Sequence, residues 1–173
     1  MRRLTSEGLV LKKKNLPGAD ILVTFFSLEA GKILAMAKGA KKITSRRASQ
    51  IQTGNLVRFM AAKRHEMYYL SETHTISAFS GIKKDRQKLS IMYFLLFMID
   101  RLLPENQREV DLYEHTKKFI VNLAKGKASL AHLEEYTNEL LMNLGFIENR
   151  ETLSQLKKRI EELTGQKLPF FVI

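Results

Sequence analysis

The sequence contains no cysteine among its 173 residues. This absence excludes disulfides, thiolate nucleophiles and zinc sites that depend on cysteine. It is also compatible with a reducing cytosol. The four histidines are His65, His74, His115 and His132. They lack the spacing of metal ligands. We therefore expect no metal site and no cofactor.

Long apolar runs are absent as well. The longest spans residues 91–99 and ends at Asp100 and Arg101. It is too short for a hydrocarbon core, which needs about 20 residues, so we interpret it as a helix buried nearly all round. The early apolar stretch at residues 8–11 runs into three lysines and does not resemble a secretory signal. We expect a soluble, cytoplasmic protein with no membrane partner.

No group of residues indicates catalysis. Serine, histidine and aspartate do not assemble into a recognisable motif, and the sequence lacks the spacing of a Walker loop. Many carboxylates stand near lysines at helical spacing, as Glu114 does with Lys118, which is ordinary surface pairing. We expect that the protein is not an enzyme.

Positive charge is concentrated in the first half of the chain. Residues 1–80 carry 14 Lys and Arg against 5 Asp and Glu, a balance of +9, whereas residues 81–173 carry 15 against 13, or +2. A one-sided field of this sign attracts phosphate backbones and releases their counterions. The alternative is a basic surface that serves only solubility. The nucleic-acid interpretation requires the cations to share one continuous face.

Strand patterns dominate the first 80 residues. We expect strands near residues 5–13, 20–28, 33–37, 56–62 and 67–75, with turn residues or glycine between several of them. Five short strands in this length predict a small barrel such as an OB-fold, and an SH3-like barrel is the alternative. Residues 38–53 are polar, basic and without periodicity, which indicates a loop.

Helical spacing replaces this pattern after Phe79. Apolar residues predict four helices, near residues 89–103, 110–123, 130–144 and 153–163, that form an antiparallel bundle. Pro104 ends the first, Gly145 and Gly165 follow the last two, and Ser129 is a candidate N-cap. The predicted class is α+β, with an OB-fold β-barrel domain at residues 1–79 and an α-helical domain at residues 80–173.

The basic residues of the first half are the candidate contacts to a phosphate backbone. The predicted loop carries five of them on a segment that can follow such a backbone, and Gly39 allows close approach. Consecutive lysines of a strand point to alternate faces, so at most two of Lys12, Lys13 and Lys14 serve one surface. Alternatively, these three lysines belong to an edge strand whose charge prevents aggregation. The candidate set is Lys12, Lys14, Lys32, Lys38, Lys41, Lys42, Arg46, Arg47, Arg58, Lys63 and Arg64.

Aromatic residues in the barrel are candidate stacking platforms for unpaired bases. Tyr68 and Tyr69 are the best pair, because alternation forces one of the two to face away from the core. Most aromatic residues of a small barrel belong to its core.

A series of short motifs resembles the bacterial RecO family. In the first half they are EGLVLK at residues 7–12, GADILVT at 18–24, GKI at 31–33 and AKGAKK at 37–42 with Ser45 and Arg46. In the second half they are LLPE at residues 102–105, the stretch ending in LGF at 144–146, and residues 160–168. The resemblance covers nearly the whole chain.

This resemblance implies a recombination mediator without catalysis. Such a protein binds single- and double-stranded DNA, anneals complementary strands, and with RecR assists RecA loading on DNA coated with single-strand-binding protein. It would be associated with the nucleoid. The acidic tail of single-strand-binding protein, which ends in an apolar residue, would suit a cation beside a small apolar pocket. Candidates for that contact are Arg101, Lys117 and Lys118. Ordinary helix-surface charge is the alternative.

The chain departs from the family pattern in two places. Many members carry four cysteines after the LGF stretch, forming a zinc module, whereas here residues 147–150 lead directly into the last predicted helix. The chain therefore resembles a short form without that module. A proline often follows the family's equivalent of Gln52, where this chain has Thr53. An RNA-binding accessory module and a non-catalytic adaptor that recruits partners through its helices are the alternative functions.

Overall fold

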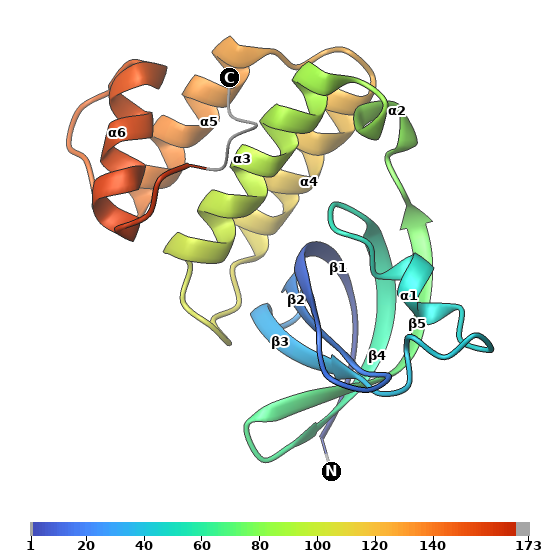
Figure 1. Cartoon of the computed structure of the whole chain (residues 1–173). Coiled ribbons are helices and arrows are strands. Elements are labelled where there is room, and N and C mark those ends of the chain that lie inside the picture. The colour runs from blue at the N-terminus through green and yellow to red at the C-terminus, as the bar shows by residue number, and fades with distance from the viewer. Residues whose placement is uncertain (1, 169–173) are drawn as a thin grey trace.

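Five strands close into a barrel (Figure 1). The computed structural model of the protein describes residues 2–168. Its strands pair in the order β1-β2-β3-β5-β4 and return to β1; only β3 and β5 are parallel. This is the strand order of an OB-fold, so the predicted fold is confirmed and the SH3-like alternative is excluded. The strands are β1 (Arg2–Asn15), β2 (Ile21–Ser27), β3 (Gly31–Ala37), β4 (Leu56–Arg64) and β5 (Met67–Ser77).

Alternating side chains fill the barrel. Val10, Phe25 and Phe59 are buried there, and the rings of Phe25 and Phe59 stack with centroids 4.6 Å apart. The two phenylalanines come from β2 and β4, which both pair with β1. Strands rich in aromatic and β-branched residues thus give the barrel a packed interior.

The second half of the chain is helical, and its four predicted helices are present. Asp85 caps the first by accepting from the backbone N–H groups of Gln87 and Lys88, and Thr152 caps the last. The structure adds two four-residue helices that are too short to show a period. The helices are α1 (Arg47–Gln50), α2 (Ser80–Lys83), α3 (Arg86–Leu102), α4 (Val110–Ala124), α5 (Leu130–Asn143) and α6 (Leu153–Thr164). No described helix is long and apolar enough to cross a membrane.

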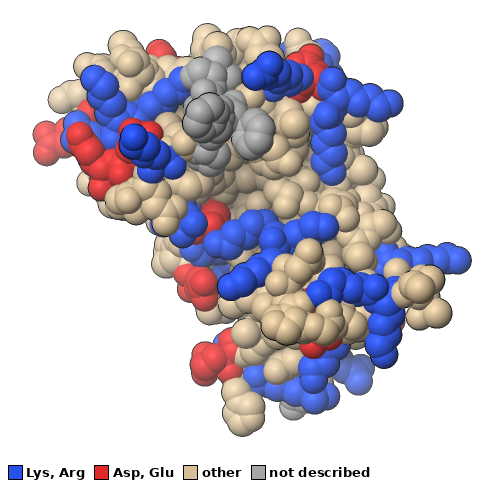
Figure 2. Space-filling model, in the orientation of Figure 1, with Lys and Arg blue, Asp and Glu red and all other residues tan. Residues whose placement is uncertain are grey.

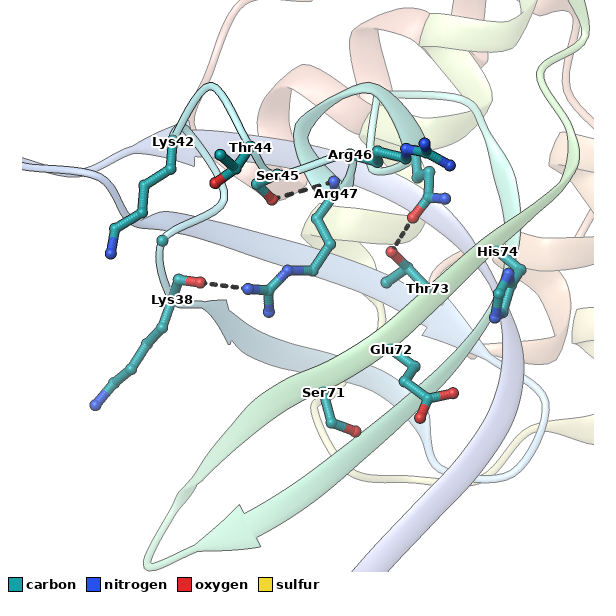
Figure 3. Close-up of a pocket in the computed structure, with 12 residues that line it drawn as sticks. Lys38, Lys42, Thr44, Ser45, Arg46, Arg47, Ser71, Glu72, Thr73 and His74 are labelled. Atoms are coloured by element: carbon teal, nitrogen blue, oxygen red, sulfur yellow. Dashed lines mark hydrogen bonds between the residues drawn. The ribbon is translucent and has the colours of Figure 1, made fainter.

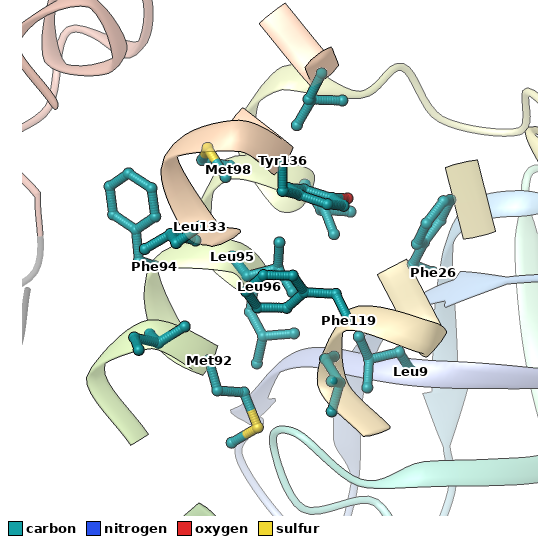
Figure 4. Close-up of a cluster of buried hydrophobic side chains, with 14 of the residues drawn as sticks. Leu9, Phe26, Met92, Phe94, Leu95, Leu96, Met98, Phe119, Leu133 and Tyr136 are labelled. Atoms are coloured by element: carbon teal, nitrogen blue, oxygen red, sulfur yellow. The ribbon is translucent and has the colours of Figure 1, made fainter. Parts of the chain in front are cut away.

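A second apolar cluster joins the outer side of the barrel to the helices (Figure 4). Helix α3 is buried on most of its circumference, as predicted for residues 91–99. Leu9, Leu11 and Phe26 turn away from the barrel interior and join the helical cluster. The ring of Phe26 meets that of Tyr113 on α4 edge to face, with centroids 5.4 Å apart. The predicted division at residue 79 therefore falls between two parts that are packed together.

A polar contact fixes α4 against β1. Glu7 accepts hydrogen bonds at Oε1 from the hydroxyl of Tyr113 at 3.0 Å and from Nζ of Lys117 at 2.5 Å. Burial and the nearby carboxylate of Glu7 raise the pKa of Tyr113 well above its ordinary value. Tyr113 therefore stays a neutral donor to Glu7.

The turn between β2 and β3 lies against the connection between α3 and α4. The backbone N–H of Asn106 donates to the carbonyl of Lys32 at 2.8 Å, and Nε of Arg108 donates to the carbonyl of Leu28 at 3.3 Å. Gly31 has φ +67°, and a Cβ at this position would lie 1.7 Å from the carbonyl oxygen of Gln107. Only glycine permits this close approach.

Candidate nucleic-acid interface

An open groove lies between the β3–α1 connection and the outer side of β5 (Figure 3). Its volume is about 690 Å³. One wall carries Lys38, Lys42, Arg46 and Arg47, and the other carries residues 71–74 of β5. In Figure 1 this connection projects on the side of the barrel away from α5 and α6.

The base of the connection is firmly attached to the barrel. Ala40 is fully buried, and the backbone N–H groups of Gly39 and Lys41 donate to Oδ1 of Asp20 and to the carbonyl of Ala19. Arg47 spans the groove, because its guanidinium donates to the carbonyls of Lys38 at 2.7 Å and of β5 residue Leu70 at 3.1 Å. The groove is therefore shaped by backbone contacts at the base of the connection and by the side chain of Arg47.

Three cations of the groove are available to a ligand. Within residues 2–168, the side chains of Lys38, Lys42 and Arg46 make no hydrogen bond or ion pair with another residue. All three are exposed. Glu72 is the one acidic residue among those that line the groove in the described part of the chain. The groove keeps a positive excess that is not neutralised internally.

Tyr69 is the outward-facing member of the tyrosine pair. Tyr68 packs against the barrel core, whereas Tyr69 is flanked by Nζ of Lys38, 5.1 Å from its ring centroid, and by the guanidinium of Arg64 at 5.8 Å. Lys63 lies 5.6 Å from the ring of Tyr68 and 3.9 Å from a carboxylate oxygen of Glu66. Two cations therefore lie near the ring of Tyr69, and one of them, Lys38, lines the groove.

Other candidate cations lie around the groove at different distances. Arg58 is exposed on β4 and is paired in register with His74, a groove residue. Lys41 turns toward the β1–β2 connection and donates to the carbonyl of Leu16 at 2.5 Å. Lys14 is exposed near the end of β1. Figure 2 shows that Lys and Arg cover much of the barrel in that view, with few acidic residues among them.

Lys32 and Lys12 correct the prediction that all these cations share one face. Lys32 is buried, with 8% of its surface exposed, and its Nζ donates to the carbonyl of Asp100 near the end of α3 at 2.7 Å. Burial lowers the pKa of Lys32. Lys12 pairs with Oδ2 of Asp100 at 2.7 Å. Both lysines connect the barrel to α3, so Lys32 is unavailable to a phosphate and Lys12 is neutralised.

The three candidates for an acidic tail are not brought together. Arg101 lies beside Asp100 and over the ring of Phe97, at 5.8 Å from its centroid. Lys117 is paired with Glu7. Lys118 lines a groove between α4 and α5 that also carries Glu135 and Glu139, which would repel an acidic peptide. Arg101, Lys117 and Lys118 therefore do not form a single site, and each remains a separate candidate.

The sequence patterns missed the β5 wall of the groove. Glu72 and His74 face outward, while Thr73 points inward and donates to Oε1 of Gln50 on α1. Alternation along β5 places residues 72 and 74 on one side, but only the folded β3–α1 connection makes that side a groove wall.

The residues present do not fit a zinc ion. The chain has no cysteine, and residues 2–168 contain no group of three or more His, Asp or Glu placed to hold a metal. Residues 147–150 connect α5 to α6 directly.

A closed OB-fold barrel with a cationic groove, joined to a helical bundle, defines the class of this protein. Residues 1–79 match the family model described as "Recombination protein O N terminal". The DNA repair protein RecO of Caldanaerobacter subterraneus subsp. tengcongensis is 29% identical over 149 residues, which cover 85% of this chain and 60% of that protein. RecO of Thermoanaerobacter sp. (strain X514) is 29% identical over 150 residues, with the same coverage.

The similarity extends beyond the barrel. RecO of Clostridium acetobutylicum is 27% identical over 164 residues, which cover 92% of this chain and 65% of that protein. The similarity to RecO proteins thus covers most of the chain, and the family model covers its barrel. The chain spans about 60% of the length of the first two relatives.

Proposed function

We propose that the chain is a DNA-binding mediator of recombinational repair, whose groove between the β3–α1 connection and β5 holds the backbone of single- or double-stranded DNA. The observation that carries this proposal is the set of Lys38, Lys42 and Arg46, which are exposed and make no polar side-chain contact within residues 2–168. Unpaired cations on a rigid wall can replace the counterions of several phosphates. Similarity to RecO, whose relatives are named DNA repair proteins, supports DNA as the ligand.

Tyr69 supports binding of single strands in particular. Lys38 and Arg64 flank its ring, so a phosphate on either cation would bring the adjacent base near an aromatic surface. Base stacking on an aromatic side chain contributes about 1–3 kcal/mol per base and tolerates any sequence. The groove would therefore bind DNA without sequence preference. Exposed Arg58, Lys14 and Arg64 would extend the contact beyond the groove.

The test is a titration of a labelled single-stranded oligonucleotide at several salt concentrations. The matched variants are K38E/K42E/R46E in the groove and K125E/K127E/R150E, three exposed cations of the helical half. Each phosphate contact contributes about −0.7 to the slope of log K against log salt for a single strand. The groove variant should flatten that slope by about 2 and weaken binding, whereas the control should not. Equal affinities for the two variants would place the DNA site elsewhere.

We further propose that this groove supports the annealing of complementary strands and assists the loading of RecA on DNA. The family resemblance supports single-strand-binding protein, RecR and, indirectly, RecA as partners. The measurement is annealing of complementary oligonucleotides coated with single-strand-binding protein, followed by fluorescence quenching. The groove variant should anneal more slowly than the helical control. Annealing that is as fast with the groove variant would contradict the proposal.

A further inference from the structure

Ile43 is a fully exposed apolar side chain on a basic loop. Its relative exposure is 104%, and the next most exposed large hydrophobic residue within residues 2–168 is Ile76, at 46%. Single exposed apolar residues are common on protein surfaces and need a second observation before they indicate a ligand. Here that observation is the way in which the loop holds and surrounds the side chain.

The backbone holds Ile43 at the tip of the loop. The N–H of Ser45 donates to the carbonyl of Lys42 at 2.8 Å, which closes a turn with Ile43 and Thr44 at its centre. A preceding turn is closed by the N–H of Lys42 and the carbonyl of Gly39 at 3.1 Å. The first turn contains the buried Ala40, and the turn that carries Ile43 follows it directly, so the isoleucine is presented outward from a fixed base.

Cations stand on both sides of this side chain in the sequence. Lys41 and Lys42 precede it and Arg46 follows it, and Lys42 and Arg46 line the groove together with Thr44. The stem of Lys42 lies over Gly39, near the site that a Cβ would occupy. Ile43 itself does not line the groove, but it lies between Lys42 and Thr44, which do, so a strand whose phosphates bind these cations would pass beside it.

We propose that Ile43 is a wedge that inserts between adjacent bases of a nucleic-acid strand held in the groove. The inference rests on the proposed function and adds to it a contact with bases. Proteins that bend or unstack nucleic acids use apolar side chains, isoleucine among them, to separate neighbouring bases. The wedge takes unpaired or easily unstacked bases of any sequence, because it makes no hydrogen bond.

A lipid surface is the less favoured occupant. Helices that bind membranes bury a broad apolar face, whereas within residues 41–46 isoleucine is the one large apolar side chain. The nearby groove with Tyr69 offers a nucleic acid further contacts that a membrane would not use.

The chain has no tryptophan, so a single tryptophan gives a clean reporter. We would compare I43W with the control I76W, which labels the exposed isoleucine of β5. The ligands are a single-stranded oligonucleotide and inorganic polyphosphate, which carries the charge but no bases. The oligonucleotide should quench the I43W emission strongly through stacking, while polyphosphate should not. The I76W emission should change little with either ligand.

A second pair of variants measures the contribution to affinity. I43S should weaken oligonucleotide binding about tenfold, or 1.4 kcal/mol, and leave polyphosphate binding unchanged. I76S should change neither. Because Ile43 contacts no core residue, these changes should not affect folding.

The outcomes separate this inference from the proposed function. Oligonucleotide binding, followed by anisotropy, without quenching of I43W would overturn the wedge and leave the DNA groove standing. No oligonucleotide binding at low salt would overturn both. A shift of the I43W emission with phosphatidylglycerol vesicles, and none with the oligonucleotide, would assign Ile43 to a membrane and overturn the wedge.

Discussion

Substituting Gly31 with alanine should destabilise the whole protein. A Cβ at this position would lie 1.7 Å from the carbonyl oxygen of Gln107, and the backbone has φ +67°. The left-handed conformation alone costs an alanine about 1–2 kcal/mol. The α3–α4 connection must also move, which breaks the hydrogen bonds from Asn106 to Lys32 and from Arg108 to Leu28. Each contributes about 1 kcal/mol net.

The expected loss for G31A is therefore about 3–4 kcal/mol. For a chain of this length, about 2–4 °C of melting temperature correspond to each kcal/mol, so Tm should fall by about 10 °C. The matched control is G18A, at φ +77°, where no atom lies within 4 Å of the added Cβ. G18A carries only the conformational cost and should lower Tm by about 4 °C. Thermal and urea unfolding followed by circular dichroism measure both. Equal losses for the two variants would refute the close contact as the cause.

Three further predictions concern Lys32 compared with Lys42, the contacts of Glu7, and the buried tyrosines. K32M should lower the urea midpoint and leave DNA affinity unchanged, whereas K42Q should weaken DNA binding and leave the urea midpoint unchanged. Urea unfolding and oligonucleotide titration of both variants check this. E7Q should cost about 1–2 kcal/mol, because it weakens charge-assisted hydrogen bonds from Tyr113 and Lys117, as chemical denaturation will show. Stability should fall as pH rises above about 10, because the raised pKa values of Tyr113 and Tyr136 keep both protonated in the folded state while the unfolded chain ionises. Melting curves between pH 9 and 11 should show a shallower fall for Y136F than for the unsubstituted protein.

The local patterns were sufficient to predict the elements of the fold. Short runs of strand-forming residues, separated by turn residues or glycine, placed strands where β1 to β5 lie, and helical spacing with Pro104 and Gly145 placed α3 to α6. These signals are local, because they depend on the residue types and the apolar spacing within one element. The closure of the barrel is not local. The parallel pairing of Ala35 with Tyr68 separates an OB-fold from other small barrels, and nothing in either strand alone specifies it.

The site was predicted less completely than the fold, and Lys32 shows why. Its positive charge within the basic first half suggested a phosphate contact, but the carbonyl that it binds belongs to Asp100, 68 positions away. The neighbouring Gly31, expected only in the short connection between two strands, is also required for contact with the α3–α4 connection. The sequence shows that a cation is present, but tertiary packing determines which group that cation binds.

The distinction between charge and availability has a consequence for how DNA binding should respond to salt. Arg47 and Lys41 donate to carbonyls, which have no net charge to offset theirs, so both still add to the field that attracts a polyanion. They cannot leave those carbonyls to bind a phosphate without losing protein hydrogen bonds. Counterion release counts phosphates that are contacted, so the salt slope should reflect the exposed and unpaired cations. Within residues 2–168, these are Lys14, Lys38, Lys42, Arg46, Arg58 and Arg64 among the candidates.

For the same reason, substitution of Arg47 should affect binding differently from substitution of Arg46. R46Q removes an available charge and should flatten the salt slope by about 0.7 without changing Tm. R47Q removes the link between Lys38 and Leu70 across the groove, so it should lower Tm as well as affinity. Salt titrations and melting curves of the two variants measure both effects. If R47Q left Tm unchanged, the groove would not depend on this arginine for its shape, and the separation of structural from ligand-binding cations would fail at its central residue.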